Sequence, residues 1–567
     1  MKLVIAEKPS VAKTIADVIG AREKKEGYFE GSNYLVSWCV GHLVRMVNPE
    51  KYDGKYAKWK MEDLPIFPSE YIYELNPKTK KQFSILKKLM ADKRVDSIVN
   101  ACDAGREGEL IFRLVYDHAK CKKKIERLWI SSMEDSAIRE GFNTLKDGSE
   151  YENLYSSAKS RSIADWLVGM NLSRLYSCLY NQSYSVGRVQ TPTLNMIVER
   201  DISIERFVKE KYYTVEIKCE DITLSTERID DYEVANQLRN LIDDKIKITD
   251  LINKEKITRP DKPYDLTTLQ REANKAYGYS AKKTLDLAQS LYEKKLITYP
   301  RTDSRYLTED MKSSLLNLLK NTDSNFEIHE SSYLSIFDNS KVTDHYAIIP
   351  TLMINKDQEN KLVNDEKNIY KLIQSKLLMA CSKPLVESMT KVIYEYDGFD
   401  FFANGKTVLD EGFRKYSINL QDKKEAKLPL LEAGDELEVL EVLVQEKHTK
   451  PPQHFTEDTL LKAMEKAGSE ALGKDIEVER YGLGTPATRA GIIENLIFKG
   501  FIKRDKKKLI ATHKGVALVA IVADEFKSPT TTSIWEMKLS GISEGKIKKE
   551  EFIKEIQESI ERIVDMY

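Results

Sequence analysis

The sequence contains few cysteines and no apolar run long enough for a membrane span. Its six cysteines are scattered without a Cys-x-x-Cys pair, so neither a zinc ribbon nor a disulfide framework is expected, and buried reduced thiols are the simplest interpretation. The apolar stretch Val516 to Ala523 is far shorter than the roughly 20 residues that a membrane helix needs. Met1 to Ala6 is followed at once by charged residues, so no signal peptide is expected. These absences predict a cytoplasmic protein that does not contact a membrane.

An excess of basic residues is also missing. Lysine and arginine number 89 and aspartate and glutamate number 90, for a net charge of −1, so composition gives no support for nucleic-acid binding. No internal repeat of fixed period and no long low-complexity tract is present, which argues against a solenoid or a coiled coil. The length of 567 residues exceeds what one hydrophobic core supports and predicts about three to five domains.

The N-terminal segment has a strand, a polar loop and a helix in succession. Lys2 to Ala6 is a short apolar run, and Val11, Ile15 and Val18 then recur at helical spacing. Ser10 is the expected N-cap of this helix.

The same pattern returns about 100 residues later. An apolar strand at Asp96 to Cys102 precedes a polar loop at Asp103 to Gly108, and a helix follows. The buried stripe of that helix is expected to contain Leu110, Ile111, Leu114 and Val115. In an open α/β sheet, loops that follow strands gather at one edge, where ligands bind. Both polar loops are therefore expected to face one site in an α/β domain spanning residues 1–150.

The rest of the chain alternates between helical and strand-like patterns, which predicts a multidomain α/β and α+β protein. Helices dominate residues 151–210 and 264–385, whereas strand-like alternation marks residues 211–263 and 386–452. Thr485 and Pro486 begin a helix that runs to about Phe498, and a hairpin with a lysine-rich tip follows, which resembles a winged-helix unit. We expect 151–210 with 453–567 to form one DNA-binding domain, 211–263 with 386–452 to form a β domain, and 264–385 to be a helical insertion.

Two constellations carry the chemistry. The first is acidic, with Glu7 after the early strand and Asp103 and Glu107 after the later one, and carboxylates set this way can hold Mg²⁺. A solvated acidic loop is the alternative on spacing alone. The second is Tyr299-Pro300-Arg301, in which a fixed cation lies two residues from a phenol that could act as a nucleophile. Because the chain has 29 tyrosines, most of which are expected to be packing residues, this tyrosine alone is weak evidence for catalysis.

The wider context resembles one family. Tyr-Pro-Arg-Thr-Asp-Ser at residues 299–304 is similar to the active-site motif of type IA topoisomerases, and the acidic pair is similar to their Toprim domain. Four more strings resemble the same family in the same order: Arg161 to Leu167, Ser185 to Pro192, Asp344 to Thr351 and Gly482 to Arg489. The resemblance covers essentially the whole chain. It implies a torus in which the Toprim domain meets the helical domain that carries Tyr299.

The resemblance also implies a mechanism. Tyr299 is expected to attack a phosphodiester of single-stranded DNA and form a 5′-phosphotyrosine, with Arg301 stabilising the developing charge. Lys8 is expected to protonate or stabilise the leaving 3′-oxygen beside Glu7, and an ordinary surface lysine is the alternative. His345 is similar to a family histidine that lies near the scissile phosphate, and a structural histidine is the alternative. Because the bond energy is stored in the adduct, cleavage, strand passage and religation need no ATP.

The expected metal site departs from the family pattern at one position. The common pattern is Asp-x-Asp-x-Glu, and the middle acid is Gly105 in this sequence. Mg²⁺ bound by Asp103 and Glu107, together with Glu7, stays feasible with extra waters, whereas two bound ions become doubtful.

A single-strand groove is expected from the remaining motifs. Arg161 and Asp165 lie at i, i+4 spacing on one helix, and Arg188, Gln190 and Thr191 are expected to contact phosphates and bases. A surface ion pair and a solvated turn are the alternatives. The expected partners are single-stranded DNA and underwound or catenated duplex DNA, acted on by a monomer, and a helicase partner stays open.

The resemblance leaves rival functions to be weighed. A protein that binds single-stranded DNA with the same fold but without cleavage is one, and the change at Gly105 gives it some weight. Another Toprim enzyme, such as a primase or a nuclease, would not need the tyrosine motif. The chain ends at Tyr567 without the cysteine-rich zinc domains that many relatives append, which favours a topoisomerase III that relaxes negative supercoils and decatenates DNA.

Overall fold

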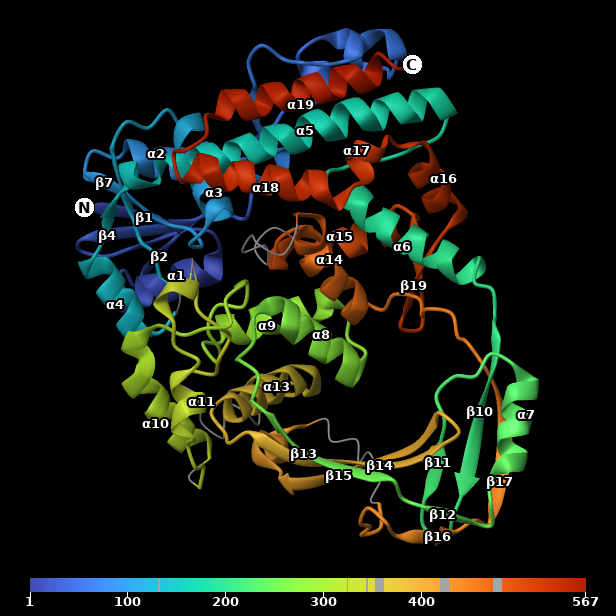
Figure 1. Cartoon of the computed structure of the whole chain (residues 1–567). Coiled ribbons are helices and arrows are strands. Elements are labelled where there is room, and N and C mark those ends of the chain that lie inside the picture. Colours follow the sequence, from blue (N-terminus) through green and yellow to red (C-terminus); the bar gives the residue numbers. More distant parts are fainter. Residues whose placement is uncertain (131–132, 324, 343–344, 352–360, 419–427, 473–481) are drawn as a thin grey trace.

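The computed structural model describes residues 1–130, 133–323, 325–342, 345–351, 361–418, 428–472 and 482–567. An α/β layer, two sets of helices and a long β sheet are arranged in a ring (Figure 1). The α/β layer and the C-terminal helices lie on one side of this ring, and the long sheet lies on the other. Within the described residues, no helix is long and apolar enough to cross a membrane.

The N-terminal part is built on a seven-stranded sheet with the order β2-β3-β4-β1-β7-β8-β9. Strand β1 is parallel to both β4 and β7, so the loops after β1 and β7 leave the sheet at the same edge. The strands and helices of this part are β1 (Lys2–Ala6), α1 (Pro9–Ile19), β2 (Glu23–Lys25), β3 (Tyr28–Glu30), β4 (Tyr34–Trp38), β5 (Val44–Met46), β6 (Tyr73–Leu75), α2 (Lys80–Ala91), β7 (Ser97–Ala101), α3 (Arg106–His118), β8 (Lys124–Arg127), α4 (Asp135–Asn143) and β9 (Lys146–Asp147).

The predicted strands and helices of this part are present, but one helix start was placed wrongly. Helix α1 begins at Pro9 with Lys8 as its N-cap residue, so the prediction of Ser10 as the N-cap is wrong. Proline suits the first helical position because its missing N–H would have no partner there and its φ is already helical. The predicted stripe of α3 is confirmed, since all four of its residues are buried.

The last part of the chain folds back onto earlier helices. Helices α18 and α19 pack along α5, and β19 and α16 pack against α6. One hydrophobic cluster contains residues of both segments, for example Leu172 and Leu539. The predicted helix from Pro486 to Phe498 and the hairpin after it are confirmed. The bounds are α5 (Glu152–Tyr180), α6 (Gln190–Glu205), α14 (Glu457–Leu472), α15 (Pro486–Phe498), β18 (Ile502–Asp505), β19 (Lys508–Ala511), α16 (His513–Ile521), α17 (Asp524–Lys527), α18 (Pro529–Ser543) and α19 (Lys549–Val564).

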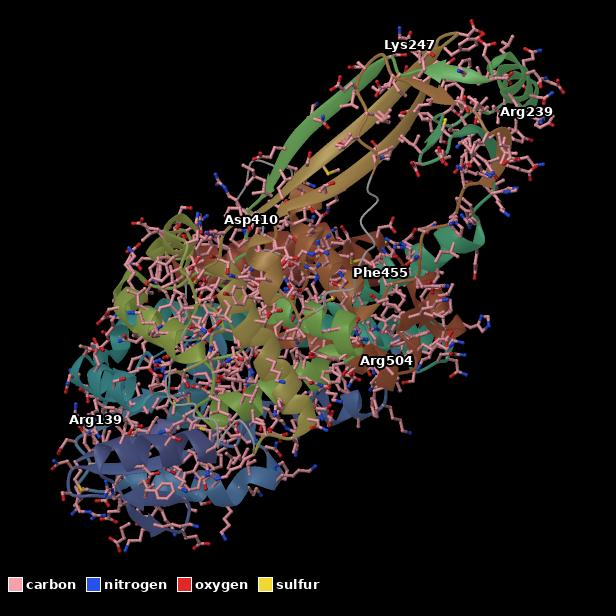
Figure 2. All side chains as sticks on the ribbon, turned by 90° about the horizontal axis from the view of Figure 1, so that it is seen from below. Arg139, Arg239, Lys247, Asp410, Phe455 and Arg504 are labelled. Carbon is pink, nitrogen blue, oxygen red and sulfur yellow. The ribbon has the colours of Figure 1, made fainter. Side chains whose placement is uncertain are left out.

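A six-stranded sheet with the order β13-β14-β15-β11-β10-β17 pairs strands from before and after a helical segment. Seen from below, it extends away from the helices, with Lys247 near its far end and Arg139 at the opposite end of the molecule (Figure 2). Its region contains β10 (Lys211–Lys218), β11 (Thr223–Ser225), α7 (Tyr232–Leu241), β12 (Lys245–Lys247), β13 (Asp250–Thr258), β14 (Leu385–Tyr396), β15 (Phe399–Asp410), β16 (Glu436–Glu438) and β17 (Glu441–His448). The intervening helices are α8 (Leu266–Tyr277), α9 (Ala281–Glu293), α10 (Lys312–Thr322), α11 (Glu330–Leu334) and α13 (Asn364–Ala380). The expected domain boundaries themselves stay predictions.

The cysteines match expectation only in part. All six are free thiols, and four of them are buried. Cys121 and Cys178 are only partly buried, so the expectation of uniformly buried thiols is wrong for these two.

Glu457 ties the helices of residues 264–380 to the C-terminal part. Its side chain is buried at the start of α14, where one oxygen accepts a hydrogen bond from the backbone N–H of Ala281 at 2.6 Å. The other oxygen accepts one from Nε of Arg504 at 2.8 Å. Ala281 is the first residue of α9, so the carboxylate also lies at the positive end of that helix. This contact fixes how two distant segments meet.

Replacing this carboxylate is expected to destabilise the fold. In Glu457→Ala, the buried N–H of Ala281 loses its acceptor and Arg504 loses a partner. The expected loss is about 2–3 kcal/mol in the free energy of unfolding, measured in urea.

Asp458→Ala is the matched control. Asp458 is the next residue and pairs with Arg271 at 2.8 Å, but both side chains are about a quarter exposed, at 27% and 24%. Its loss is expected to cost less than about 1 kcal/mol. Equal losses for the two variants would contradict the assigned role of Glu457.

Candidate active site

Tyr299 lies in a buried setting between the two halves of the site. It follows a bridge between Ile297 and Pro350 that holds its segment against the chain near His345. Only 6% of Tyr299 is exposed. Its ring lies 4.3 Å from the ring of His345 and 5.2 Å from that of Tyr292, centre to centre. These rings restrict the phenol to one direction, toward the N-terminal sheet.

The phenol meets a carboxylate at the edge of that sheet. Tyr299 Oη donates a hydrogen bond to Asp103 Oδ2 at 2.5 Å, across 196 residues of sequence. Asp103 follows β7, as the strand pattern predicted. The structure therefore brings together the tyrosine motif and the acidic loop, which the sequence could only assign to one family.

The space around this contact is small. The cavity lined by Tyr299, Asp103, His345 and neighbouring apolar residues has a volume of 20 Å³, which is about enough for one water molecule and not for a nucleotide. Val11 and Ile15 of α1 belong to the same hydrophobic cluster as Tyr299. The site is therefore closed, and a phosphodiester can reach Tyr299 only if the two walls separate.

Electrostatics keep the phenol protonated in this closed state. Burial, together with the negative charges of Asp103 and Glu7, raises the pKa of Tyr299 well above its usual value, while Arg301 opposes this. Burial lowers the pKa of Arg301, but the contact with Tyr299 and the negative charges of Asp103 and Glu7 outweigh it and raise the pKa overall. Nε of Arg301 is buried without a hydrogen-bond acceptor among the described residues. Arg301 is thus a cation beside the phenol with a free donor.

Glu7 and Asp103 form a pair of neighbouring carboxylates. Glu7 is 6% exposed, and burial followed by the charge of Asp103 raises the pKa of Glu7 to about 7. Lys8, half-buried at the start of α1, opposes this shift. Two carboxylates that repel each other in this way suit a bound cation, which would relieve the repulsion.

Glu107 is directed elsewhere. It lies 2.5 Å from Nε2 of His42, which lowers the pKa of Glu107 and raises that of His42. In the described part of the chain, no group of three or more His, Cys, Asp and Glu side chains is arranged to hold a metal ion. The three carboxylates expected to bind Mg²⁺ thus do not converge in this closed form, and the metal set stays a prediction.

His42 was missed in the sequence, although a signal existed. It follows β4, a parallel neighbour of β1, so it lies at the same sheet edge as Glu7 and Asp103.

The glycine at position 105, where the family pattern has an acid, has a structural reason. Its φ of 146° and ψ of 172° belong to a region that is essentially restricted to glycine. An aspartate at this position would be strained, so the missing middle acid accompanies a particular loop conformation.

Arg127 is a second residue that sequence reasoning missed. It is 1% exposed, and its guanidinium donates to the carbonyl oxygens of Asn100, Cys102 and Leu128 at 2.8–3.0 Å. It also donates to the carbonyl oxygen of Asp103 at 2.8 Å. These bonds fix the backbone of the acidic loop. The signal was an arginine at the end of β8, which is the parallel neighbour of β7.

His345 supports the same loop from the other wall. Its Nε2 lies 2.9 Å from the carbonyl oxygen of Ala104, to which the neutral ring donates. Burial lowers the pKa of His345 to about 4, so the ring is neutral near pH 7. Asp344, the first residue of the predicted string, lies outside the described residues.

The expected DNA-binding arginines lie in a separate ion cluster. Arg188 is buried, and its Nε donates to Asp165 at 2.9 Å while Nη1 donates to Glu536 at 2.8 Å. Arg161 lies 4.0 Å from Asp165 and 3.9 Å from Glu536. Arg106 also reaches Glu536, at 3.4 Å. Glu536 was missed because it lies nearly 350 residues after Arg188.

Gln190 and Thr191 make contacts within the protein. Gln190 accepts hydrogen bonds from Asn495 at 3.0 Å and Lys499 at 3.4 Å, and Thr191 accepts one from the backbone N–H of Gly187 at 3.1 Å. Thr191 is fully buried. Their contact with DNA stays a prediction, and in this closed form their polar atoms stabilise the protein.

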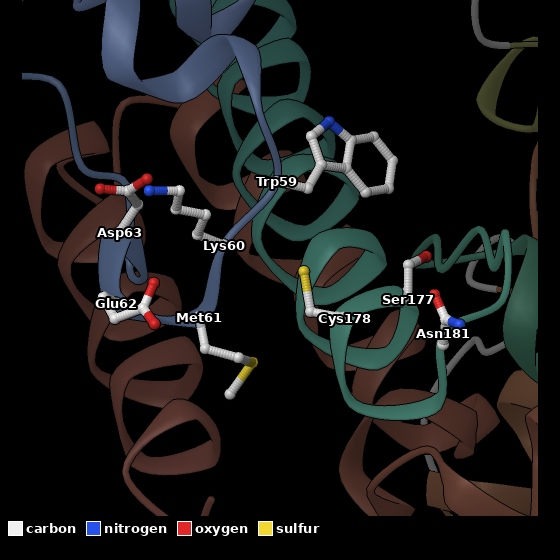
Figure 3. A pocket seen from close by; sticks show the side chains of 8 residues that line it. All are labelled: Trp59, Lys60, Met61, Glu62, Asp63, Ser177, Cys178 and Asn181. Atoms are coloured by element: carbon white, nitrogen blue, oxygen red, sulfur yellow. The ribbon is translucent and has the colours of Figure 1, made fainter.

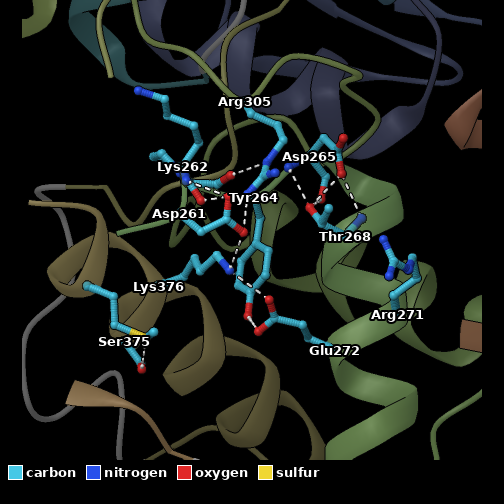
Figure 4. Close-up of polar contacts among 12 residues, drawn as sticks. Asp261, Lys262, Tyr264, Asp265, Thr268, Arg271, Glu272, Arg305, Ser375 and Lys376 are labelled. Atoms are coloured by element: carbon cyan, nitrogen blue, oxygen red, sulfur yellow. Dashed lines mark hydrogen bonds and ion pairs between the residues drawn. The ribbon is translucent and has the colours of Figure 1, made fainter. Parts of the chain in front are cut away.

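A second polar network anchors the segment after Tyr299 (Figure 4). Arg305 donates to the carbonyl oxygens of Lys262 and Pro263 at 2.9 and 3.0 Å and pairs with Asp261 at 2.8 Å. Lys376 of α13 joins Asp261 at 3.1 Å. The chain that enters the helical segment from β13 is thereby tied to the loop that carries the tyrosine motif.

A larger pocket lies away from the chemistry. It has a volume of 710 Å³ and is lined by residues 59–63 together with Ser177, Cys178 and Asn181 of the α5 end (Figure 3). None of the predicted site residues lines it. The volume of this pocket is therefore not evidence that it is the active site.

Comparison with known proteins agrees with this geometry. A family model described as "DNA topoisomerase" matches residues 149–554, and one described as "Toprim domain" matches residues 2–133. DNA topoisomerase 3 of Bacillus licheniformis is 40% identical over 98% of this chain and 80% of its own length. DNA topoisomerase 3 of Bacillus subtilis is 39% identical over the same shares.

A solved structure has the same fold. Full-length topoisomerase I from Thermotoga maritima matches with a TM-score of 0.77 at 23% identity, covering 99% of this chain and 90% of its own. The buried tyrosine that faces a Toprim carboxylate, together with the two family matches, defines a type IA DNA topoisomerase. Within this class, the chain belongs to the topoisomerase III family. A Toprim domain typically binds a divalent metal ion.

The neutral state of His345 predicts a pH dependence of stability. Its pKa is 6.5 for the free side chain and about 4 in the fold, so the unfolded chain binds the proton more tightly. Stability from this group is present above pH 6.5 and is lost as the pH falls toward 4. When the pH falls from 7.5 to 4.5, the free energy of unfolding, measured in urea, is expected to decrease in both proteins. The decrease is expected to be about 2–3 kcal/mol larger in the wild type than in His345→Gln. Equal acid sensitivity in the two proteins would argue that His345 titrates normally.

Proposed function

We propose that the chain cleaves one DNA strand with Tyr299, passes another strand through the break and reseals it without ATP. The observation that carries this proposal is the hydrogen bond from Tyr299 Oη to Asp103 Oδ2 at 2.5 Å. It directs the phenol of the tyrosine motif at the acidic loop. The substrates are single-stranded DNA and underwound or catenated duplex DNA, and the protein acts as a cytoplasmic monomer.

Attack requires the phenol to lose its proton. With Asp103 as its closed-state acceptor, Tyr299 already points its proton at a carboxylate, which takes up the proton before the entering phosphate displaces the contact. Arg301 then favours the phenolate and the charge that develops on the phosphate oxygens. The free Nε donor of Arg301 supports this role.

The leaving 3′-oxygen needs a proton or a positive charge. Lys8 is half-buried beside Glu7 and supplies this charge. The products are a 5′-phosphotyrosine and a free 3′-hydroxyl. The phosphotyrosine conserves the energy of the broken bond, so the hydroxyl can attack it in reverse.

Asp103 and Glu7 are the residues that would hold a Mg²⁺ ion, and Glu107 would join them after leaving His42. The bound ion would neutralise the carboxylates and hold phosphate oxygens in line for religation. The repulsion between Glu7 and Asp103, which raises the pKa of Glu7 to about 7, supports this assignment.

Strand cleavage tests the proposal most simply. A single-stranded oligonucleotide labelled at either end is mixed with protein and quenched with alkali. An adduct on the 5′ phosphate, mapped to Tyr299 by mass spectrometry, is expected. Tyr299→Phe removes only the nucleophilic oxygen and should abolish the adduct, whereas Tyr292→Phe, which changes the neighbouring ring, should retain it. DNA binding without an adduct in the wild type would favour the DNA-binding protein without cleavage.

Removal of divalent cations is expected to separate the two chemical steps. With EDTA, the oligonucleotide adduct should still form. The rate at which an added strand with a 3′-hydroxyl reverses the adduct should fall at least about tenfold, which is the effect expected for the loss of one electrostatic contact. Adding Mg²⁺ should restore it. Religation that proceeds equally well in EDTA would contradict the assigned metal set.

A further inference from the structure

Glu536 of α18 lies at the centre of three arginines next to the cleavage site. Nη1 of Arg188 donates to its Oε1 at 2.8 Å, Nη2 of Arg106 lies 3.4 Å from Oε2, and Nε of Arg161 lies 3.9 Å from Oε1. The three arginines come from the start of α3, from α5 and from the turn before α6. The C-terminal part of the chain thus provides an anion between the acidic loop and the expected DNA groove.

The three arginines are not held equally. The side chain of Arg188 is 2% exposed and that of Glu536 is 7% exposed, so this pair is enclosed. Those of Arg161 and Arg106 are 18% and 29% exposed, and their distances exceed that of a good hydrogen bond. Arg188 therefore anchors Glu536, while the other two arginines face an approach from outside.

The cluster has one more guanidinium group than directly paired carboxylates. Within 4.0 Å, three guanidinium groups pair with Glu536 and Asp165, while the more distant Glu107 acts on Arg161 and is itself paired with His42. Nη2 of Arg188 and Nη1 of Arg106 are also buried without an acceptor among the described residues. Burial raises the pKa of Glu536, but the arginines outweigh it and hold the pKa far below its usual value, so Glu536 is charged. The arrangement can accept a further anion.

We propose that Glu536 is a positioning residue that occupies the place of a DNA phosphate in the closed form and competes with DNA for Arg106 and Arg161. It rests on the proposed function, since it assumes that the strand to be cleaved passes this cluster. A phosphate that enters binds the two loosely held arginines, and Glu536 stays paired with Arg188. The competing carboxylate weakens DNA binding and so favours release of the strand after religation.

A purely structural role for Glu536 makes a different prediction. In that case, its charge would only hold α18 against Arg188, and its loss would lower stability without changing how DNA binding responds to salt. Salt dependence is the discriminating measurement because its slope counts the phosphates that the protein neutralises.

The test uses Glu536→Gln in the Tyr299→Phe background, so that no covalent adduct contributes. The amide keeps an oxygen that can accept from Arg188 but removes the charge. At low salt, the affinity for a single-stranded oligonucleotide, measured by fluorescence anisotropy, is expected to rise on the order of tenfold. The plot of log K against log salt is expected to steepen by ~0.7, the increment for one more phosphate on a single strand.

Glu555→Gln in the same background is the matched control. It removes one negative charge from the neighbouring helix α19, where Glu555 is 53% exposed and pairs with Lys538. Affinity and slope are expected to stay unchanged in this variant. A rise equal to that of Glu536→Gln would overturn the proposal, because the effect would then reflect net charge alone.

Unchanged or weaker binding by a folded Glu536→Gln protein, with an unchanged slope, would also overturn it. If that variant does not fold, Arg106→Gln, a substitution at a partly exposed position, decides: weaker binding of the oligonucleotide supports the proposal, because Arg106 then contacts a phosphate, and unchanged binding overturns it. Adduct formation by the protein with Tyr299 and Glu536 intact is measured separately. Failure of the cleavage reaction is therefore distinguishable from failure of this inference.

Discussion

The hydrogen bond between Tyr299 and Asp103 is the constraint on which the rest of the site depends. It joins the two walls of a cavity of 20 Å³, and it exists only while the phenol is protonated and the walls are closed. In the closed form, the proton of Tyr299 is therefore already directed at a carboxylate, and no phosphodiester can reach the phenol. Binding of a DNA strand must replace this contact, so chemistry and opening are coupled at one atom pair.

Rigid scaffolding on each wall confines the motion to their junction. On one side, Arg127 holds the chain where it enters the acidic loop, through the carbonyl oxygens of Asn100, Cys102 and Asp103. On the other side, Arg305 ties the tyrosine segment to the chain at Lys262 and Pro263. Glu457 joins the same helical segment to the C-terminal part. Between the walls lie apolar side chains and a few polar contacts, which can separate without unfolding either side.

Local patterns made much of the fold predictable. Strand β1 and the buried stripe of α3 follow from periodicity, and the acidic loop follows from the rule that parallel strands end at one edge. Ser10 was misassigned because Pro9 can itself begin a helix. His42, Arg127 and Glu536 could not be paired with their partners, since those partners lie 65, 24 and 348 residues away. The family resemblance indicated the role of Tyr299, but only the three-dimensional structure shows that the site is closed.

A crystal structure of the Tyr299→Phe protein with a single-stranded oligonucleotide tests the central claim most directly. The account predicts a phosphate between the ring at position 299 and Asp103, with the two walls separated and Arg301 directed at the phosphate. Oligonucleotide bound elsewhere, with the ring still packed against the acidic loop and the cavity closed, would contradict it.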